Sequence, residues 1–257
     1  ANNVGIGYNA LLSNTTASGN TAVGYQAGYT NVTGQDNTVI GYGAYKLGTA
    51  GYNLAIGYNS MSGATVTGSQ NSAIGRNSLS GLTSGAFNIA VGDDTLLRNT
   101  TGGSNTAVGK DSLYFNTTAS NNTALGYQAA YSNTTGTQNT ALGRVAMRTN
   151  TTGNYNVSVG SVALYYNTTG SYNTALGVQA LNNNTTAAAN TAVGYQALTT
   201  NTTGGDNAAF GYQAAQSNTT GDYLTAIGRQ ALYNNTTADS NTAVGYQASY
   251  ASSTGAS

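Results

Sequence analysis

The chain has 257 residues, of which only 5% are charged, and its 7 basic and 7 acidic residues leave no net charge. This balance creates no positive field for nucleic acid or an anionic membrane, so neither is expected as a partner. Cysteine, histidine, proline and tryptophan are missing, which excludes disulfides, thiolate or imidazole metal sites and nucleophile–histidine pairs. No run of about 18 apolar residues occurs, so membrane insertion within this chain is not expected.

One short motif recurs along the chain. NTAVGYQA stands at residues 20–27, 190–197 and 241–248, with near-copies between them. The glycine after its aliphatic residue, here called the ruler glycine, recurs from Gly7 to Gly245 at a spacing of 17 residues, broken only by a short interval before Gly57 and a long one after it. Residues 1–257 are therefore predicted to form a single array of fifteen repeats, irregular around residues 41–85, with no separate catalytic domain.

Asparagine stands four residues before the ruler glycine in nearly every repeat. It tolerates a left-handed turn conformation, and its amide both donates and accepts hydrogen bonds. Stacked at about 4.8 Å, such side chains can form a continuous ladder, and a row of ligand-binding amides is the alternative. The predicted structural asparagine ladder comprises Asn20, Asn37, Asn53, Asn71, Asn88, Asn105, Asn122, Asn139, Asn156, Asn173, Asn190, Asn207 and Asn241.

A short strand is predicted directly after this asparagine. Alternate residues of Thr-Ala-Val can face opposite sides, and the spacing of apolar residues is not that of a helix. The residue before the ruler glycine is always apolar, as in Ile40 and Leu142, and is expected to form a core ridge. Leucine or methionine four residues after that glycine, as in Leu164, forms a second ridge. The fold class is thus all-β, a β-solenoid with one coil per repeat.

Tyrosine often follows the ruler glycine. Rings on successive coils can stack and stabilise each step by about 0.5 to 1.5 kcal/mol, and the alternative is an aromatic stripe that grips cell-surface carbohydrate. The predicted aromatic ladder comprises Tyr8, Tyr25, Tyr42, Tyr58, Tyr195 and Tyr212.

Most repeats contain Asn-Thr-Thr or a relative seven residues after the ruler glycine. Each fits the Asn-x-Thr acceptor pattern for glycosylation, whereas a polar turn closed by Gly or Ala is the structural alternative. The column is regular and expected to be exposed, so glycans on the asparagines or on the paired threonines remain a hypothesis. The candidate asparagines are Asn14, Asn31, Asn99, Asn116, Asn133, Asn150, Asn167, Asn184, Asn201, Asn218 and Asn235.

Several of the charged residues fall in consecutive repeats in the middle of the chain. Arg76, Asp93 and Lys110 occupy one column of consecutive repeats and are expected to form a weak charge ladder. Asp94 and Asp111 should stack beside it, but two carboxylates without further ligands make a poor calcium site and no catalytic pair. We therefore predict no catalytic residue, no metal site and no cofactor.

Two apolar ridges do not offset the conformational entropy lost on ordering each 17-residue coil. Burial against other chains is therefore expected, in a homotrimer or a filament. Because solenoid ends present unpaired strand edges, end-to-end assembly is also a hypothesis.

The motif NTAVG, with its variants NSAIG, NTALG and NVSVG, resembles the Ser-Val-Ala-Ile-Gly repeats in the YadA-like head of trimeric autotransporter adhesins. It is also similar to NTAVGYQAL-type arrays of phage and bacterial tail-fibre-like proteins. The adhesin resemblance implies a left-handed parallel β-roll, three chains side by side and a surface-attachment role. The repeat of 17 residues departs from it by being longer, with the extra residues in the Asn-Thr-Thr turn.

The expected function is an extracellular structural fibre or filament shaft, on a cell surface or a virion, that serves attachment or surface assembly. A phage tail-fibre shaft in host recognition is the first alternative. A glycan-coated filament scaffold and an ice-binding solenoid are further alternatives, the latter because threonine recurs before Ala-Val-Gly. Enzyme activity is not expected.

Overall fold

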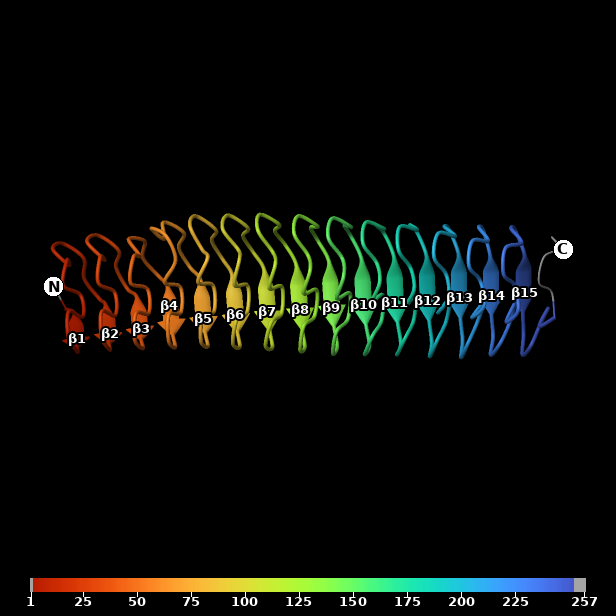
Figure 1. Ribbon diagram of the computed structural model, residues 1–257, viewed down its shortest axis with the longest axis horizontal. Coiled ribbons are helices and arrows are strands. Elements are labelled where there is room, and N and C mark those ends of the chain that lie inside the picture. The colour runs from red at the N-terminus through yellow and green to blue at the C-terminus, as the bar shows by residue number, and fades with distance from the viewer. Residues whose placement is uncertain (1, 252–257) are drawn as a thin grey trace. The chain divides into compact units, whose positions relative to one another are not determined.

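The structure, a computed structural model, describes residues 2–251 and consists of parallel β-solenoid coils (Figure 1). It has two compact units, Ala1–Gln128 and Ala129–Ser257. Within each unit every strand pairs in parallel with the next one in the sequence, so that one repeat forms one coil. The predicted all-β solenoid with 17-residue coils is confirmed. Residues 1 and 252–257 of the predicted array lie outside the described residues.

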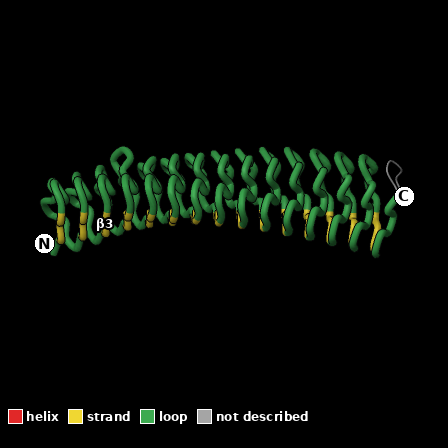
Figure 2. Tube along the Cα trace, turned by 60° about the horizontal axis from the view of Figure 1, so that its bottom comes forward, coloured by secondary structure: helices red, strands yellow, loops and turns green. Residues whose placement is uncertain are grey.

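Each coil contributes one strand of three residues (Figure 2, yellow), and no helix occurs within the described residues. Accordingly, residues 2–251 hold no helix of a length and hydropathy that could cross a bilayer. The strands of the first unit are β1 (Val4–Ile6), β2 (Thr21–Val23), β3 (Thr38–Ile40), β4 (Leu54–Ile56), β5 (Ser72–Ile74), β6 (Ile89–Val91), β7 (Thr106–Val108) and β8 (Thr123–Leu125). Those of the second unit are β9 (Thr140–Leu142), β10 (Val157–Val159), β11 (Thr174–Leu176), β12 (Thr191–Val193), β13 (Ala208–Phe210), β14 (Thr225–Ile227) and β15 (Thr242–Val244).

The interior of the coil is narrow, and two columns supply most of its apolar side chains. The middle residue of each strand is small and buried, as Ala141 and Ala175 are, and the residue four positions after the ruler glycine, such as Leu164, is also buried. Where Ser158 replaces the strand alanine, its hydroxyl donates to the carbonyl oxygen of Ala163 at 2.8 Å. The ridge predicted four residues after the ruler glycine is therefore confirmed as core.

The core ridge predicted immediately before the ruler glycine is wrong. Ile40, Leu142 and Phe210 are 39%, 43% and 41% exposed. Successive residues of a strand point to opposite sides of a sheet. Because the alanine in the middle of each strand faces the interior, the first and third residues must face outward.

Left-handed backbone is common in the coil but does not fall on the ladder asparagines, contrary to the sequence-based expectation. Within one coil Tyr155, Val162 and Leu164 have φ of 57°, 62° and 49°, and Asn156 is not among the residues with positive φ. The chain therefore turns at the residue before the asparagine and at two positions after the ruler glycine.

The shortened coil after Gly41 is filled by a buried tyrosine. The hydroxyl of Tyr45 donates to the carbonyl oxygen of Ala50 at 2.8 Å and accepts from Nδ2 of Asn53 at 3.0 Å. Burial raises the pKa of Tyr45 to about 12, although these two hydrogen bonds act to lower it. Its ring occupies the space that a Cβ at residue 48 would need. Gly48 stands where most repeats have the asparagine of Asn-Thr-Thr. In this shortened repeat the ring of Tyr45 takes the place of that asparagine.

The ruler glycines stack directly on one another. Gly143 has a φ of +137°, and a Cβ added there would lie 2.6 Å from the carbonyl oxygen of Gly160 in the next coil. The backbone conformation and the close approach both require glycine at this position.

We expect the substitution Gly143→Ala to lower the free energy of unfolding by at least about 2 kcal/mol, because it combines a disfavoured backbone conformation with a steric clash. Gly5→Ala is the control, because its Cβ makes only an ordinary contact at 3.5 Å and most other coils have alanine there. Thermal and urea unfolding followed by circular dichroism measures both. Equal stability of the two variants would contradict the argument.

Candidate interaction surface

The asparagines before the strands form a buried hydrogen-bonded ladder. Oδ1 of Asn139 accepts from the backbone N–H of Asn156 at 2.9 Å, and Oδ1 of Asn156 accepts in the same way from Asn173 at 2.9 Å. Nδ2 of Asn156 also donates to the carbonyl oxygen of Gly170 at 2.9 Å. Each side chain thus joins two turns of backbone. Amides held in this way are not presented to a ligand.

The candidate glycosylation asparagines form a second ladder inside the coil. All of them except Asn14, which is half-buried, are buried, so the expectation that this column is exposed is wrong. Nδ2 of Asn150 donates to Oδ1 of Asn133 at 2.8 Å and to the carbonyl oxygen of Gly153 at 3.0 Å. Both amide protons are therefore engaged, and the folded chain does not offer this nitrogen for modification.

The second ladder stops where the repeat is irregular. Asn31 is buried and its Oδ1 has no hydrogen-bond partner. In the following coils Tyr45, Val66 and Leu82 fill the interior, and all three are fully buried. The side chains of these three residues thus replace the second asparagine ladder over these coils.

From residue 99 onward, the two threonines of each Asn-Thr-Thr turn differ in their surroundings. The first is half-buried, and its hydroxyl donates to a carbonyl oxygen of the next coil, as from Thr151 to Thr168 at 3.0 Å. The second, such as Thr152, is exposed, and within the described residues its hydroxyl has no hydrogen-bond partner. One threonine holds the stack together while the other faces solvent.

The predicted tyrosines form exposed stacks. Ring centroids are 5.5 Å apart for Tyr8 and Tyr25, 4.8 Å for Tyr25 and Tyr42, 5.3 Å for Tyr42 and Tyr58, and 5.3 Å for Tyr195 and Tyr212. Interplanar angles of 10° to 16° show that the rings are nearly parallel. The rings of Tyr25 and Tyr42 each have a stacked ring on both faces and therefore offer only their edges to a sugar.

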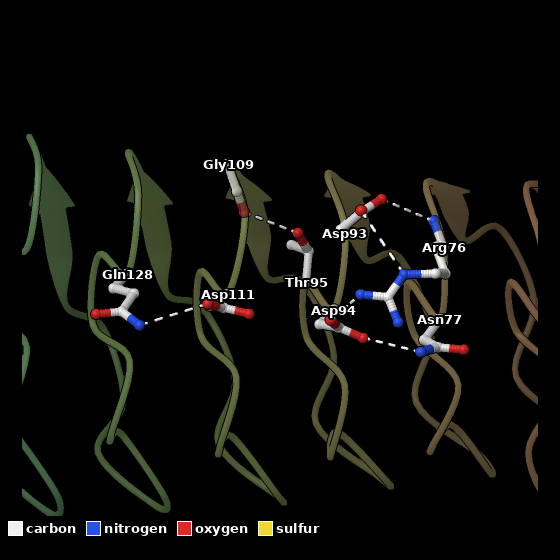
Figure 3. Close-up of polar contacts among 8 residues, drawn as sticks. All are labelled: Arg76, Asn77, Asp93, Asp94, Thr95, Gly109, Asp111 and Gln128. Atoms are coloured by element: carbon white, nitrogen blue, oxygen red, sulfur yellow. Dashed lines mark hydrogen bonds and ion pairs between the residues drawn. The ribbon is translucent and has the colours of Figure 1, made fainter.

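Charged residues form one local cluster in the first unit (Figure 3). Nη2 of Arg76 lies 2.6 Å from Oδ2 of Asp94, and its Nε lies 3.7 Å from Oδ2 of Asp93. Asp94 also accepts from Nδ2 of Asn77 at 2.9 Å, and Asp111 accepts from Nε2 of Gln128 at 3.4 Å. Because the Arg76 and Asp93 side chains are about half exposed, the cluster contributes at most about 1 kcal/mol per pair.

The most extensive surface feature is the outside of the sheet. We call the first and third residues of the strands the outer sheet face. The strands pair in register, so that Leu142, Val159 and Leu176 are neighbours. The third-position residues of the second unit are all apolar: Leu142, Val159, Leu176, Val193, Phe210, Ile227 and Val244.

Sequence reasoning missed this face because it placed the larger apolar residue inside. The signal that could have found it is the almost invariant smallness of the middle strand residue, as in Ala141, Ser158 and Ala175. Only small side chains fit a narrow interior, so the middle position had to face inward and its two neighbours outward.

No protein-family model matches the chain, and no curated protein matches it. What is shown is a repetitive β-solenoid of 17-residue coils. Within residues 2–251 there is no pocket and no group of three or more acidic, histidine or cysteine side chains that could hold a metal.

Removing one rung of the first ladder tests its contribution. We expect Asn156→Ala to cost about 1 to 3 kcal/mol, because it leaves the buried N–H of Asn173 without its acceptor. Asn183→Ala is the control, since that side chain is half-buried and makes no hydrogen bond within the described residues. Urea unfolding of both variants gives the comparison. An Asn156→Ala variant as stable as the control would show that the ladder is dispensable.

Proposed function

We propose that the chain is a shaft segment of an extracellular structural fibre, in which the outer sheet face packs against other copies of the same chain. The observation that carries this proposal is the row of exposed apolar side chains along paired strands. Contiguous exposed apolar surface of this kind is typical of interaction sites. Ile74, Leu176 and Ile227 are exposed on it, and no strand contains a charged residue.

A second copy is the partner that fits this face best. Side chains on the face repeat at the spacing of paired strands, about 4.8 Å. A partner can place its side chains between those of successive coils along the whole face only if its own side chains repeat at the same spacing. Another array of 17-residue coils meets this condition, and its uncharged face adds no unpaired charge to the interface.

Three chains per fibre is the assembly we propose, on the likeness of NTAVG to the adhesin head repeats. Attachment to a cell surface or a virion, and the tail-fibre variant of the shaft, belong to the same proposal. Within it, the asparagine ladders hold each solenoid together and the outer sheet face holds the solenoids to one another. End-to-end continuation of the array is compatible with this side-by-side packing of the chains.

Charge placed on the face tests the proposal. We expect the double variant Leu142→Glu, Leu176→Glu to weaken self-association by at least about a hundredfold, because each buried, unpaired carboxylate costs several kcal/mol. The control carries the same charges on the same coils outside the face, at Thr152→Glu and Thr186→Glu. Sedimentation velocity, with electron microscopy to count chains in cross-section, measures all three proteins. A monomeric parent chain, or equal association of both variants, would contradict the proposal.

Ice binding is the second candidate, and one observation favours it. Thr174, Thr191 and Thr225 stand at the outward first position of their strands, and their hydroxyls make no hydrogen bond within the described residues. The column is interrupted by Val4, Leu54, Ser72, Ile89, Val157 and Ala208, which lowers its regularity.

Thermal hysteresis separates the two candidates. A fibre shaft whose face is covered by other copies should show none. Hysteresis that is present in the parent chain and lost on Thr174→Lys, Thr191→Lys would favour the ice-binding candidate instead. The pair Thr169→Lys, Thr186→Lys, outside the face, is the control for added charge.

A further inference from the structure

From the Asn-Thr-Thr turns we infer that the second threonine of each turn is a site of O-linked glycosylation. In the second unit these residues run from Thr135 through Thr152 and Thr169 to Thr237 at intervals of 17 residues. The inference concerns a different surface from the outer sheet face and does not rest on the fibre proposal.

The second threonine is the accessible acceptor in the turn. Thr135, Thr152, Thr169, Thr186 and Thr203 are all exposed. Their hydroxyls make no hydrogen bond within the described residues, so modification sacrifices no contact that stabilises the coil. The reactive oxygen is therefore free in the folded chain.

The other two candidates in the same turn are excluded by their contacts. Asn150 is fully buried, and both protons of its amide are donated. Thr151 uses its hydroxyl to bond the carbonyl oxygen of Thr168, so a sugar there would remove one link between coils. The three residues of the turn thus have different roles. The asparagine and the first threonine hold the coils together, and the second threonine is the acceptor.

The residue that follows the acceptor leaves it unshielded. It is always glycine or alanine in these turns and is buried, as Gly153 and Ala187 are. In this turn even the Cβ of an alanine at Gly153 would press on the carbonyl oxygen of Gly170. The residue immediately C-terminal to the acceptor is therefore glycine or a buried alanine, and no exposed side chain stands there to block an enzyme.

The chemistry is a substitution at the anomeric carbon of a nucleotide-activated sugar. Oγ1 of the threonine forms the new C–O bond while the bond from the anomeric carbon to the phosphate oxygen breaks. The hydroxyl proton passes to a base of the glycosyltransferase, and the nucleoside diphosphate leaves. No oxidant or reductant is needed.

A sugar coat also suits the composition of the chain. A protein with no net charge has little electrostatic repulsion to keep it dispersed, and here only 5% of residues are charged. Sugars on the turns would add hydrated surface outside the outer sheet face and leave that face open. Lateral contacts would then be confined to one side of each coil.

Mass spectrometry of the protein isolated from its natural source tests the inference. After digestion with a broad-specificity protease, electron-transfer fragmentation assigns each modified residue. We expect sugar masses on Thr152, Thr169 and their equivalents, removable by mild base. Unmodified turns would overturn the inference, and sugar on Asn150 or Thr151 would overturn the site assignment.

Two variants expressed in the source organism sharpen the test. Thr152→Val should remove one glycan from the intact mass, whereas Thr151→Val should keep it. The reverse pattern, or no change with either variant, would contradict the assignment. Self-association of the glycosylated chain is measured separately by sedimentation, so failure of one proposal is distinguishable from failure of the other.

Discussion

The narrow interior of the coil is the constraint on which the other features depend. A 17-residue coil with one three-residue strand leaves room inside for an alanine from the strand and a leucine from the following turn, as with Ala175 and Leu181. Larger strand residues must therefore face outward. Apolar side chains that most proteins would bury in a core are here exposed on the outer sheet face. A single coil therefore does not cover its own apolar residues and is incomplete as a structural unit.

The same narrowness explains the polar interior. Backbone groups that turn inward are shielded from bulk solvent, so each must be paired with a partner such as the neighbouring coil. Two columns of asparagine supply those partners, because one amide can accept a backbone N–H and donate to a carbonyl at once, as Asn156 does. A repeat can lose an asparagine only where something else fills the space, and Tyr45 shows how a ring with its own hydroxyl does so.

Periodicity predicted the architecture well, because one residue column maps onto one place in the coil when every turn has the same length. The strand position, the leucine ridge and the ladder column were readable from the sequence. The direction of the strand side chains was mispredicted, because Thr-Ala-Val alternates equally well in either orientation and larger apolar residues are ordinarily buried. Only the smallness of the middle residue distinguishes the two orientations. Burial of the second asparagine column was missed for a related reason: Asn-x-Thr suggests a surface, whereas the hydrogen bonds of Asn150 require the interior.

The coil therefore has surfaces with different physical characters rather than one functional site. The outer sheet face is uncharged and carries an apolar column at the third strand position, the turns present free threonine hydroxyls, and the rings of the tyrosine stacks lie against one another. A point-like reaction centre needs several different groups converging on one volume, whereas each of these surfaces repeats one group along a line. Lines of identical groups suit partners that are themselves periodic, such as a second solenoid, a row of sugars or an ordered lattice. That correspondence, more than any single residue, is the physical basis of the proposed fibre.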